Sequence, residues 1–163
     1  PGVPTRITVE TYAEALRYAG NRAPRAAISA QFSLSWAVAA ALAQGDLGPA
    51  AYTEAALADP YLRALEAAVD LVEDPALTES GRRGARVRIG ADSAFVDSVV
   101  GDADRPMATA QAIAKFRRFA GLTLGEAGTD RAIAALMHDA PAEGFLACSR
   151  RPTSSSRAPG QSG

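Results

Sequence analysis

The sequence predicts an α+β fold in which a small antiparallel sheet is backed by helices. Strands are indicated by an alternating run at Thr5–Tyr12 and by two short strand-like runs at Ala85–Ile89 and Phe95–Val100. Helix is indicated by Ser29–Ala43, which is almost continuously apolar with residues at helical spacing. The 163 residues suit one compact unit with a core of its own. Helical patterns outweigh strand patterns, and no internal repeat is visible.

The first predicted element is a half-buried strand within Thr5–Tyr12. Ile7 and Val9 fall on one face of this strand and polar residues fall on the other. The strand runs into a short helix that Gly20 ends, because glycine commonly follows the last turn of a helix.

A second helix is predicted over Ser29–Ala43, and Gly45 follows where a helix end favours glycine. Its apolar stripe consists of Phe32, Trp36, Ala39, Ala40 and Ala43. We therefore expect this helix to be buried on most sides.

Two more short helices should follow, one opened by Pro49 and one running from Asp59-Pro60 to Ala68. Aspartate followed by proline is typical of an N-cap and a first helical turn. Val69–Val72 is then predicted as a strand, and Asp74-Pro75 stops it.

The next segment is predicted as a polar loop, Glu79–Gly84, that leads into a hairpin. Ala85–Ile89 and Phe95–Val100 are its expected strands, and Gly90–Ser93 is its turn.

After a loop at Gly101–Pro106, Thr109–Ala120 has an amphipathic pattern that predicts a helix ending at Gly121. A last helix is expected from Thr129 to His138, and the tail beyond Cys148 lacks apolar periodicity and is expected to be disordered. The predicted organisation is an α+β domain over 1–105, C-terminal helices over 106–147 and a disordered tail over 148–163.

Composition excludes several classes of partner. A formal charge of -1 and a pI near 5.9 give no basic field, so neither nucleic acid nor an anionic membrane is the expected partner. Cys148 is the single cysteine and cannot form an internal disulfide, and no signal or membrane segment is apparent. We expect a soluble, cytoplasmic protein. Because the chain begins at Pro1 and enters a strand at once, we also expect a piece of a longer protein.

Few residue groups could carry chemistry. The one histidine, His138, is expected at a helix end without a nucleophile beside it, and one cysteine with one histidine cannot complete a zinc shell. Asp102 and Asp104 lack the rest of a calcium loop. The sequence therefore predicts no catalytic residue, no metal site and no cofactor.

A candidate for substrate contact is the pair Arg82 and Arg83, enclosed by glycines at 81 and 84. Two guanidinium groups could clamp a carboxylate through bidentate hydrogen bonds. The alternative is a solvated crossover loop without a ligand.

The segment Ala30–Leu42, which reads AQFSLSWAVAAAL, resembles a segment of the MmgE/PrpD family, which includes 2-methylcitrate dehydratase, cis-aconitate decarboxylase and iminodisuccinate epimerase. Further collinear matches are Gln44–Gly48, Tyr52–Glu54, Asp59-Pro60, Leu65, Val72, Asp74-Pro75, Ala85–Ile89, Gly101, Pro106, Lys115–Arg117 and Ala120. The resemblance runs from about Thr5 to Leu146 and covers only the C-terminal part of the family, a small lid domain with helices that return to a large helical domain.

The resemblance implies a cofactor-independent lyase or isomerase acting on small di- or tricarboxylates, and a homodimer. The family's principal Asp, His and Lys residues lie upstream of the matched part, so none is assigned here. The start of the Ser33–Leu42 helix resembles the lid segment that approaches the pocket, which makes Ser33 a candidate contact. Trp36 stands where the family usually has tyrosine, and we expect its indole to be partly open to a cleft. The alternative is that Trp36 is a core residue of an alanine-rich helix and that Ser33 only caps or back-bonds the helix.

Two functions remain open from the sequence. The chain is the C-terminal segment of such an enzyme, inactive without an upstream helical domain, or it is a non-catalytic binding or assembly module or the remnant of a truncated gene. The apolar stripes on the predicted helices exceed what a small sheet can cover, so the chain alone should expose apolar surface.

Overall fold

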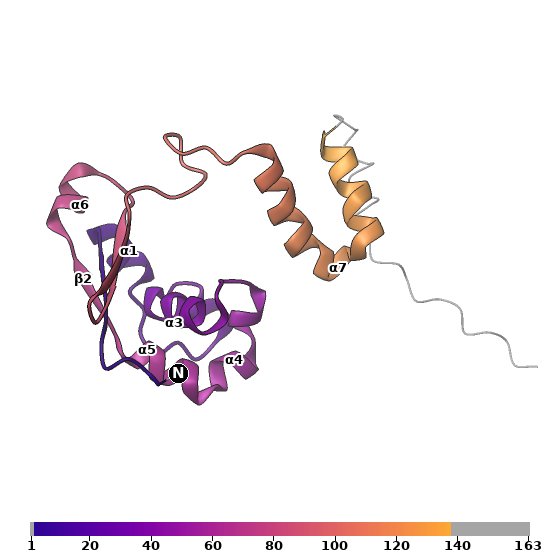
Figure 1. Ribbon diagram of the computed structural model, residues 1–163. Helices are drawn as coiled ribbons and strands as arrows, with labels where there is room; N and C mark the ends of the chain where they lie inside the picture. The colour runs from indigo at the N-terminus through magenta and orange to yellow at the C-terminus, as the bar shows by residue number, and fades with distance from the viewer. Residues whose placement is uncertain (1, 138–163) are drawn as a thin grey trace, which may run out of the picture. The chain divides into compact units, whose positions relative to one another are not determined.

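The computed structural model describes residues 2–137, and its chain divides into two compact units, Pro1–Pro106 and Met107–Gly163 (Figure 1). Within the described residues, no helix combines the length and the apolar character needed to cross a membrane. The predicted disordered tail and His138 lie outside the described residues. That 106–147 belongs to a larger helical domain stays a prediction.

The first unit contains a four-stranded sheet. Its strands are β1 (Ile7–Thr11), β2 (Val69–Glu73), β3 (Ala85–Ile89) and β4 (Asp92–Val96), in the order β2-β1-β3-β4. The α+β class is confirmed, and the antiparallel description holds for two pairings, β1 with β3 and β3 with β4. The third pairing, β1 with β2, is parallel, because the helices between these strands carry the chain back to the same end of the sheet.

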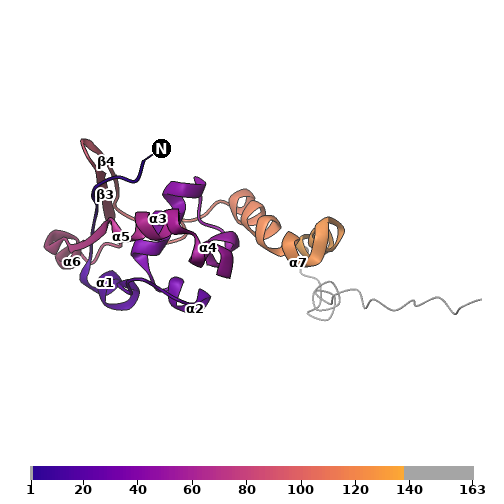
Figure 2. The same cartoon turned by 90° about the horizontal axis from the view of Figure 1, so that it is seen from below.

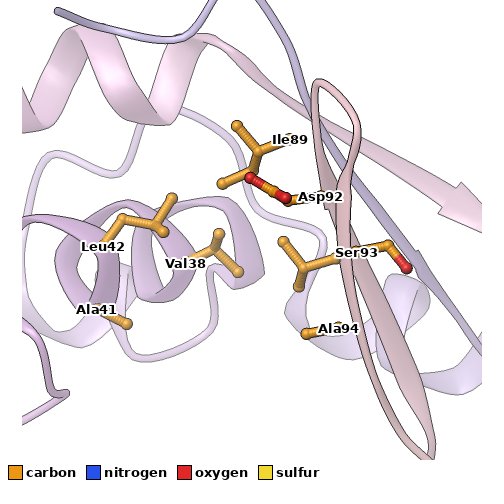
Figure 3. Close-up of a pocket in the computed structure, with 8 residues that line it drawn as sticks. Val38, Ala41, Leu42, Ile89, Asp92, Ser93 and Ala94 are labelled. Atoms are coloured by element: carbon orange, nitrogen blue, oxygen red, sulfur yellow. The ribbon is translucent and has the colours of Figure 1, made fainter.

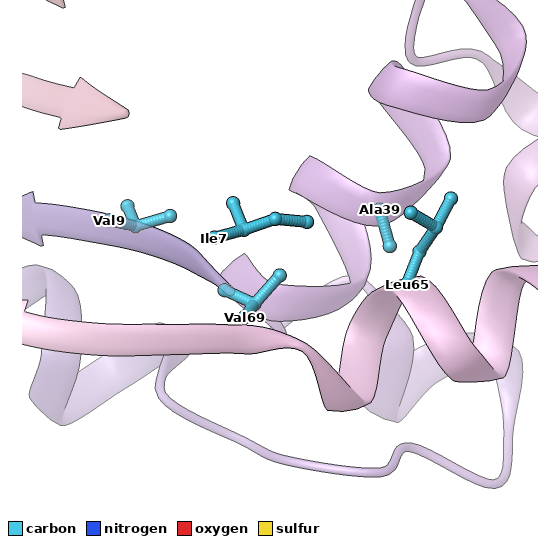
Figure 4. Close-up of a cluster of buried hydrophobic side chains, with 5 residues drawn as sticks. All are labelled: Ile7, Val9, Ala39, Leu65 and Val69. Carbon is cyan, nitrogen blue, oxygen red and sulfur yellow. The ribbon is translucent and has the colours of Figure 1, made fainter. Parts of the chain in front are cut away.

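One face of the sheet packs on α3 (Leu34–Gln44) and α5 (Pro60–Ala67). The core that joins them consists of Ile7, Val9, Ala39, Leu65 and Val69 (Figure 4). The alternation along β1 points its apolar residues to this face, as predicted. Because α3 presents Ala39 to the sheet, its backbone can approach the strands closely.

A second core lies under the helices. Trp36 and Ala30 pack with Leu57 of α4 (Glu54–Ala58) and Leu62 of α5. The predicted helix at Pro49 is a 3-10 turn, η1 (Pro49–Tyr52), and burial raises the pKa of the Tyr52 hydroxyl above its ordinary 10.0. The cap at Asp59 is confirmed, since its carboxylate accepts hydrogen bonds from two backbone N–H groups of α5.

The predicted helix over Ser29–Ala43 is wrong at its start. A short helix, α2 (Ala27–Ala30), ends before it, and α3 begins only at Leu34. The cause is Ser33, whose hydroxyl accepts from the Trp36 backbone N–H at 3.1 Å and so caps a new helix. Phe32 therefore falls in the turn between the helices and is 54% exposed instead of buried.

Two other boundaries differ from the prediction. The sequence missed α6 (Pro75–Ser80), which Asp74 caps and Gly81 ends in the left-handed conformation. The predicted strand Phe95–Val100 lies instead at Asp92–Val96, because the hairpin turns within two residues after β3, where Gly90 has a φ of 59°.

The second unit is described as α7 (Thr109–Met137), which is two helical arms broken at Gly125. The predicted break at Gly121 is wrong; Gly125 alone leaves the helical conformation, at φ 65° and ψ 176°. Thr129 donates its hydroxyl to the Gly125 carbonyl at 2.6 Å, and Arg117 pairs with Asp130 across the two arms.

Candidate functional site

A cavity of about 600 Å³ opens on the first unit beside α1 (Ala13–Ala19) and α6. These two short helices contact one another at one end of the sheet (Figure 2). The polar groups in its wall are Tyr12, Glu14, Tyr18, Thr78 and Arg83, and the remaining lining residues are Ala15, Ala19, Leu34, Leu77 and Gly81. Leu34 is the first residue of α3, so the cavity meets the start of that helix.

Hydrogen bonds fix the elements that form this wall. The backbone N–H of Ala13 donates to the Thr78 hydroxyl at 3.0 Å, which ties the start of α1 to α6. The Thr78 hydroxyl in turn donates to a carboxylate oxygen of Glu73 at 3.0 Å. Thr11, buried at the end of β1, donates to the Gly84 carbonyl at 2.8 Å and holds the segment that carries Arg83.

The structure separates the two predicted arginines. Arg83 lines the cavity, whereas Arg82 is not among its lining residues. Arg82 pairs with Asp97 at 2.7 Å and Arg83 pairs with Asp102 at 3.5 Å, and the arginine side chains are 57% and 65% exposed. Both acidic partners belong to the segment that follows β4.

Ser33 and Trp36 lie inside the first unit. Ser33 is 2% exposed, and its hydroxyl is engaged by the Trp36 backbone N–H and by the Ser35 hydroxyl at 3.2 Å. Trp36 is 0% exposed, and its indole N–H donates to the Ala51 carbonyl at 2.9 Å. The expectation that Trp36 is partly open to a cleft is wrong, because the indole anchors the second core. Substrate contact by these two residues stays a prediction.

Sequence reasoning missed a buried carboxylate, Glu66, which is 4% exposed. It accepts from the Ser35 hydroxyl at 2.6 Å and from the Ala23 backbone N–H at 3.1 Å, and Arg22 lies 3.3 Å away. These partners offset the cost of burying the charge and join α3 and α5 to the preceding loop. The sequence did contain a signal of this burial. Glu66 follows Leu62 by one helical turn and so falls on the apolar stripe of α5.

A second cavity, of about 510 Å³, lies between α3 and the β3–β4 hairpin. Val38 and Leu42 face the hairpin across it, and Ala94 and Asp92 lie on the other side (Figure 3). Its wall is almost entirely apolar, and Asp92 is its charged group. This groove cannot recognise an anion, so the cavity with Arg83 is the candidate site for a carboxylate.

The chain matches the model of the MmgE/PrpD C-terminal domain over residues 4–139. The chain belongs to the MmgE/PrpD family. The matched part agrees with the resemblance seen in the sequence, which was to the C-terminal part of the family. No curated protein matches the chain. The matched region of this MmgE/PrpD chain includes the whole wall of the candidate site.

The arrangement can bind and polarise an anion. The guanidinium of Arg83 offers paired N–H donors to a carboxylate. Tyr12 and Tyr18 also line the cavity, and a tyrosine hydroxyl can donate to a further oxygen. Among residues 2–137, no group of three or more His, Cys, Asp or Glu side chains is placed to hold a metal ion.

Proposed function

We propose that the chain is the C-terminal segment of a cofactor-independent lyase or isomerase, 2-methylcitrate dehydratase-like, that acts on small di- or tricarboxylic acids. The observation that carries this proposal is the match to the MmgE/PrpD C-terminal domain over residues 4–139. In this proposal the chain contributes the wall that binds substrate, and an upstream helical domain of the same enzyme contributes the base. The working assembly is a cytoplasmic homodimer.

The candidate site supports the binding role. Its volume of about 600 Å³ falls in the range of about 300 to 1,000 Å³ that small-molecule sites occupy. Arg83 would hold one carboxylate, and the hydroxyls of Tyr12 and Tyr18 would orient the rest of the acid. A wall that carries a guanidinium suits an anionic metabolite better than a wholly apolar wall does.

The division of labour follows from the chemistry. Removing a proton next to a carboxylate needs a base within hydrogen-bond reach of that proton. A guanidinium cannot be that base, because it does not release its proton at neutral pH. Glu66 is engaged by Ser35 and Arg22, away from the cavity wall. Glu14 is the carboxylate of the cavity wall, and the proposal leaves it a wall residue and places the base in the upstream domain.

The experiment is a reconstitution assay. The purified chain would be given 2-methylcitrate, cis-aconitate and citrate, alone and mixed with the helical domain, and the unsaturated acid and released carbon dioxide would be followed. We expect no turnover by the chain alone and turnover by the mixture. The variant Arg83→Gln should lower turnover in the mixture more than Arg6→Gln, which makes the same charge change elsewhere on the first unit.

Two outcomes would contradict the proposal. Turnover by the chain alone that is lost in His138→Ala would make that histidine a catalytic base. If turnover by the chain alone were lost in Glu14→Gln instead, the catalytic base would be the carboxylate of the cavity wall.

The alternative is a non-catalytic binding or assembly module. It is favoured by an apolar groove of about 260 Å³ between the two arms of α7, lined by Thr109, Ala112, Ile113, Phe116, Ile133, Leu136 and Met137. Such a groove fits a protein partner better than an acid. A stable complex with the helical domain that turns over none of the three acids would favour this function.

A further inference from the structure

We propose that Asp97 and Asp102 occupy Arg82 and Arg83 in place of substrate carboxylates, and that a di- or tricarboxylate displaces their loop when it binds. The loop is therefore a built-in competitor of the ligand. The inference rests on the proposed function for the class of ligand only.

The geometry that points to this is a matched pair of contacts. Two adjacent arginines at the turn before β3 each bind one aspartate of the same loop, at 2.7 Å for Arg82 with Asp97 and 3.5 Å for Arg83 with Asp102. An aspartate side chain ends in the same carboxylate as a small organic acid. Each guanidinium thus already holds one carboxylate, as it would hold a carboxylate of the acid.

The loop is organised as a unit that can move as one piece. Arg105 donates from its guanidinium to the Ser98 carbonyl at 2.9 Å, and its own carbonyl accepts from the Gly101 N–H at 2.8 Å. The Asp102 carbonyl accepts from the Arg105 N–H at 3.0 Å. These bonds lie within the loop, so their amides should exchange faster once the loop loses the support of the two arginines. Gly101, at a φ of 109°, adopts a conformation that other residues rarely reach.

The ion pairs that tie the loop to Arg82 and Arg83 are weak enough to exchange. Both ion pairs are solvent-exposed, with side-chain exposures of 57% and 54% for Arg82 with Asp97 and of 65% and 28% for Arg83 with Asp102. An exposed ion pair shifts the equilibrium between the bound and the released loop by only about two- to fivefold. A ligand with two or three carboxylates on one small frame can replace both aspartates at once, because its second contact is intramolecular.

Arg83 connects this exchange to the candidate site. The same side chain lines the cavity and binds Asp102. A carboxylate that reaches Arg83 from the cavity therefore competes with the loop for one guanidinium. A purely structural pair would differ in the loop, since removing its aspartate would still raise the affinity for an anion by removing a negative charge, but the ligand would leave the loop in place.

The test measures citrate binding to the full chain by calorimetry at constant ionic strength, without any assay of turnover. In the double variant Asp97→Asn with Asp102→Asn, we expect citrate to bind about four- to twenty-five-fold more tightly, because two competing pairs are gone. Arg83→Gln should abolish most of the binding. Asp70→Asn is the matched control, because it removes an exposed pair with Arg6 elsewhere on the first unit.

Hydrogen exchange gives an independent readout. Citrate should speed exchange at the amides of Gly101 and Arg105 or of their neighbours, whereas acetate at the same ionic strength should not. Unchanged or weaker affinity in the double variant, with a native circular dichroism spectrum, would overturn the proposal, and so would citrate binding that leaves loop exchange unaltered. Loop displacement without turnover in the reconstituted mixture would sink the proposed function and leave this inference standing.

Discussion

Replacing Trp36 by phenylalanine tests the assignment of this residue to the second core. The indole is 0% exposed, and its N–H donates to the Ala51 carbonyl, which belongs to a residue that is also 0% exposed. Phenylalanine keeps a ring near Arg63, whose guanidinium lies 5.0 Å from the indole centroid, but it has no donor and less volume. The variant therefore removes one buried hydrogen bond and leaves a gap.

The expected cost is the sum of two effects. A buried acceptor left without its donor costs about 1 to 3 kcal/mol. Loss of part of the bicyclic ring removes roughly two methylene equivalents of buried surface, at about 0.8 kcal/mol each. Allowing for partial collapse of the gap, we expect Trp36→Phe to lower the free energy of unfolding by about 2 to 4 kcal/mol.

The assay is urea unfolding followed by circular dichroism, with Phe32→Ala as the control. Both aromatic residues belong to one apolar segment, but Phe32 is 54% exposed, so its loss should cost within about 0.5 kcal/mol. Because Trp36 is the single tryptophan, acrylamide quenching of the unaltered chain reports its burial directly. Equal costs for the two variants, or an easily quenched indole, would refute the placement of Trp36.

Two further stability predictions follow from buried contacts. Glu66→Ala should lower the free energy of unfolding by about 1 to 3 kcal/mol, because it leaves polar partners buried without an acceptor; a urea midpoint close to that of the parent chain would argue against the network. Gly84→Ala should cost about 1 to 3 kcal/mol, since the added Cβ would lie 2.9 Å from Leu77 Cδ2 and 3.0 Å from the Val96 carbonyl oxygen. Gly2→Ala, where a Cβ would meet nothing within 4 Å, is the matched control for that second variant.

Local sequence patterns predicted correctly those features of a helix or strand that depend only on residues close together in the sequence. The alternation of Ile7 and Val9 set the buried face of β1, and the aspartate before Pro60 set the start of α5. The pattern failed where two local preferences compete. Phe32 and Trp36 fit one helical stripe, but the capping bond of Ser33 starts a new helix between them, and periodicity carries no information on that choice.

The candidate site was only partly predictable for a related reason. Arg82 and Arg83 are adjacent and chemically alike, so the sequence cannot say which one faces a cavity that α1 and α6 create from distant segments. The roles of Asp97 and Asp102 could not be predicted from the sequence either, because their contacts with the arginines depend on where the loop after β4 folds back. Glu66 differed, since a charged residue on an apolar stripe was visible in the sequence and predicts a buried partner.

Electrostatics links the two proposals. If a substrate carboxylate joined Arg83 while Asp102 stayed in place, two negative charges would share one positive charge. The Arg83 side chain is 65% exposed, so solvent screens this repulsion to about 1 kcal/mol or less, the same size as the worth of an exposed ion pair. Repulsion therefore favours departure of Asp102 when an acid binds Arg83, and hydrogen exchange in the loop would detect that departure even when no reaction follows.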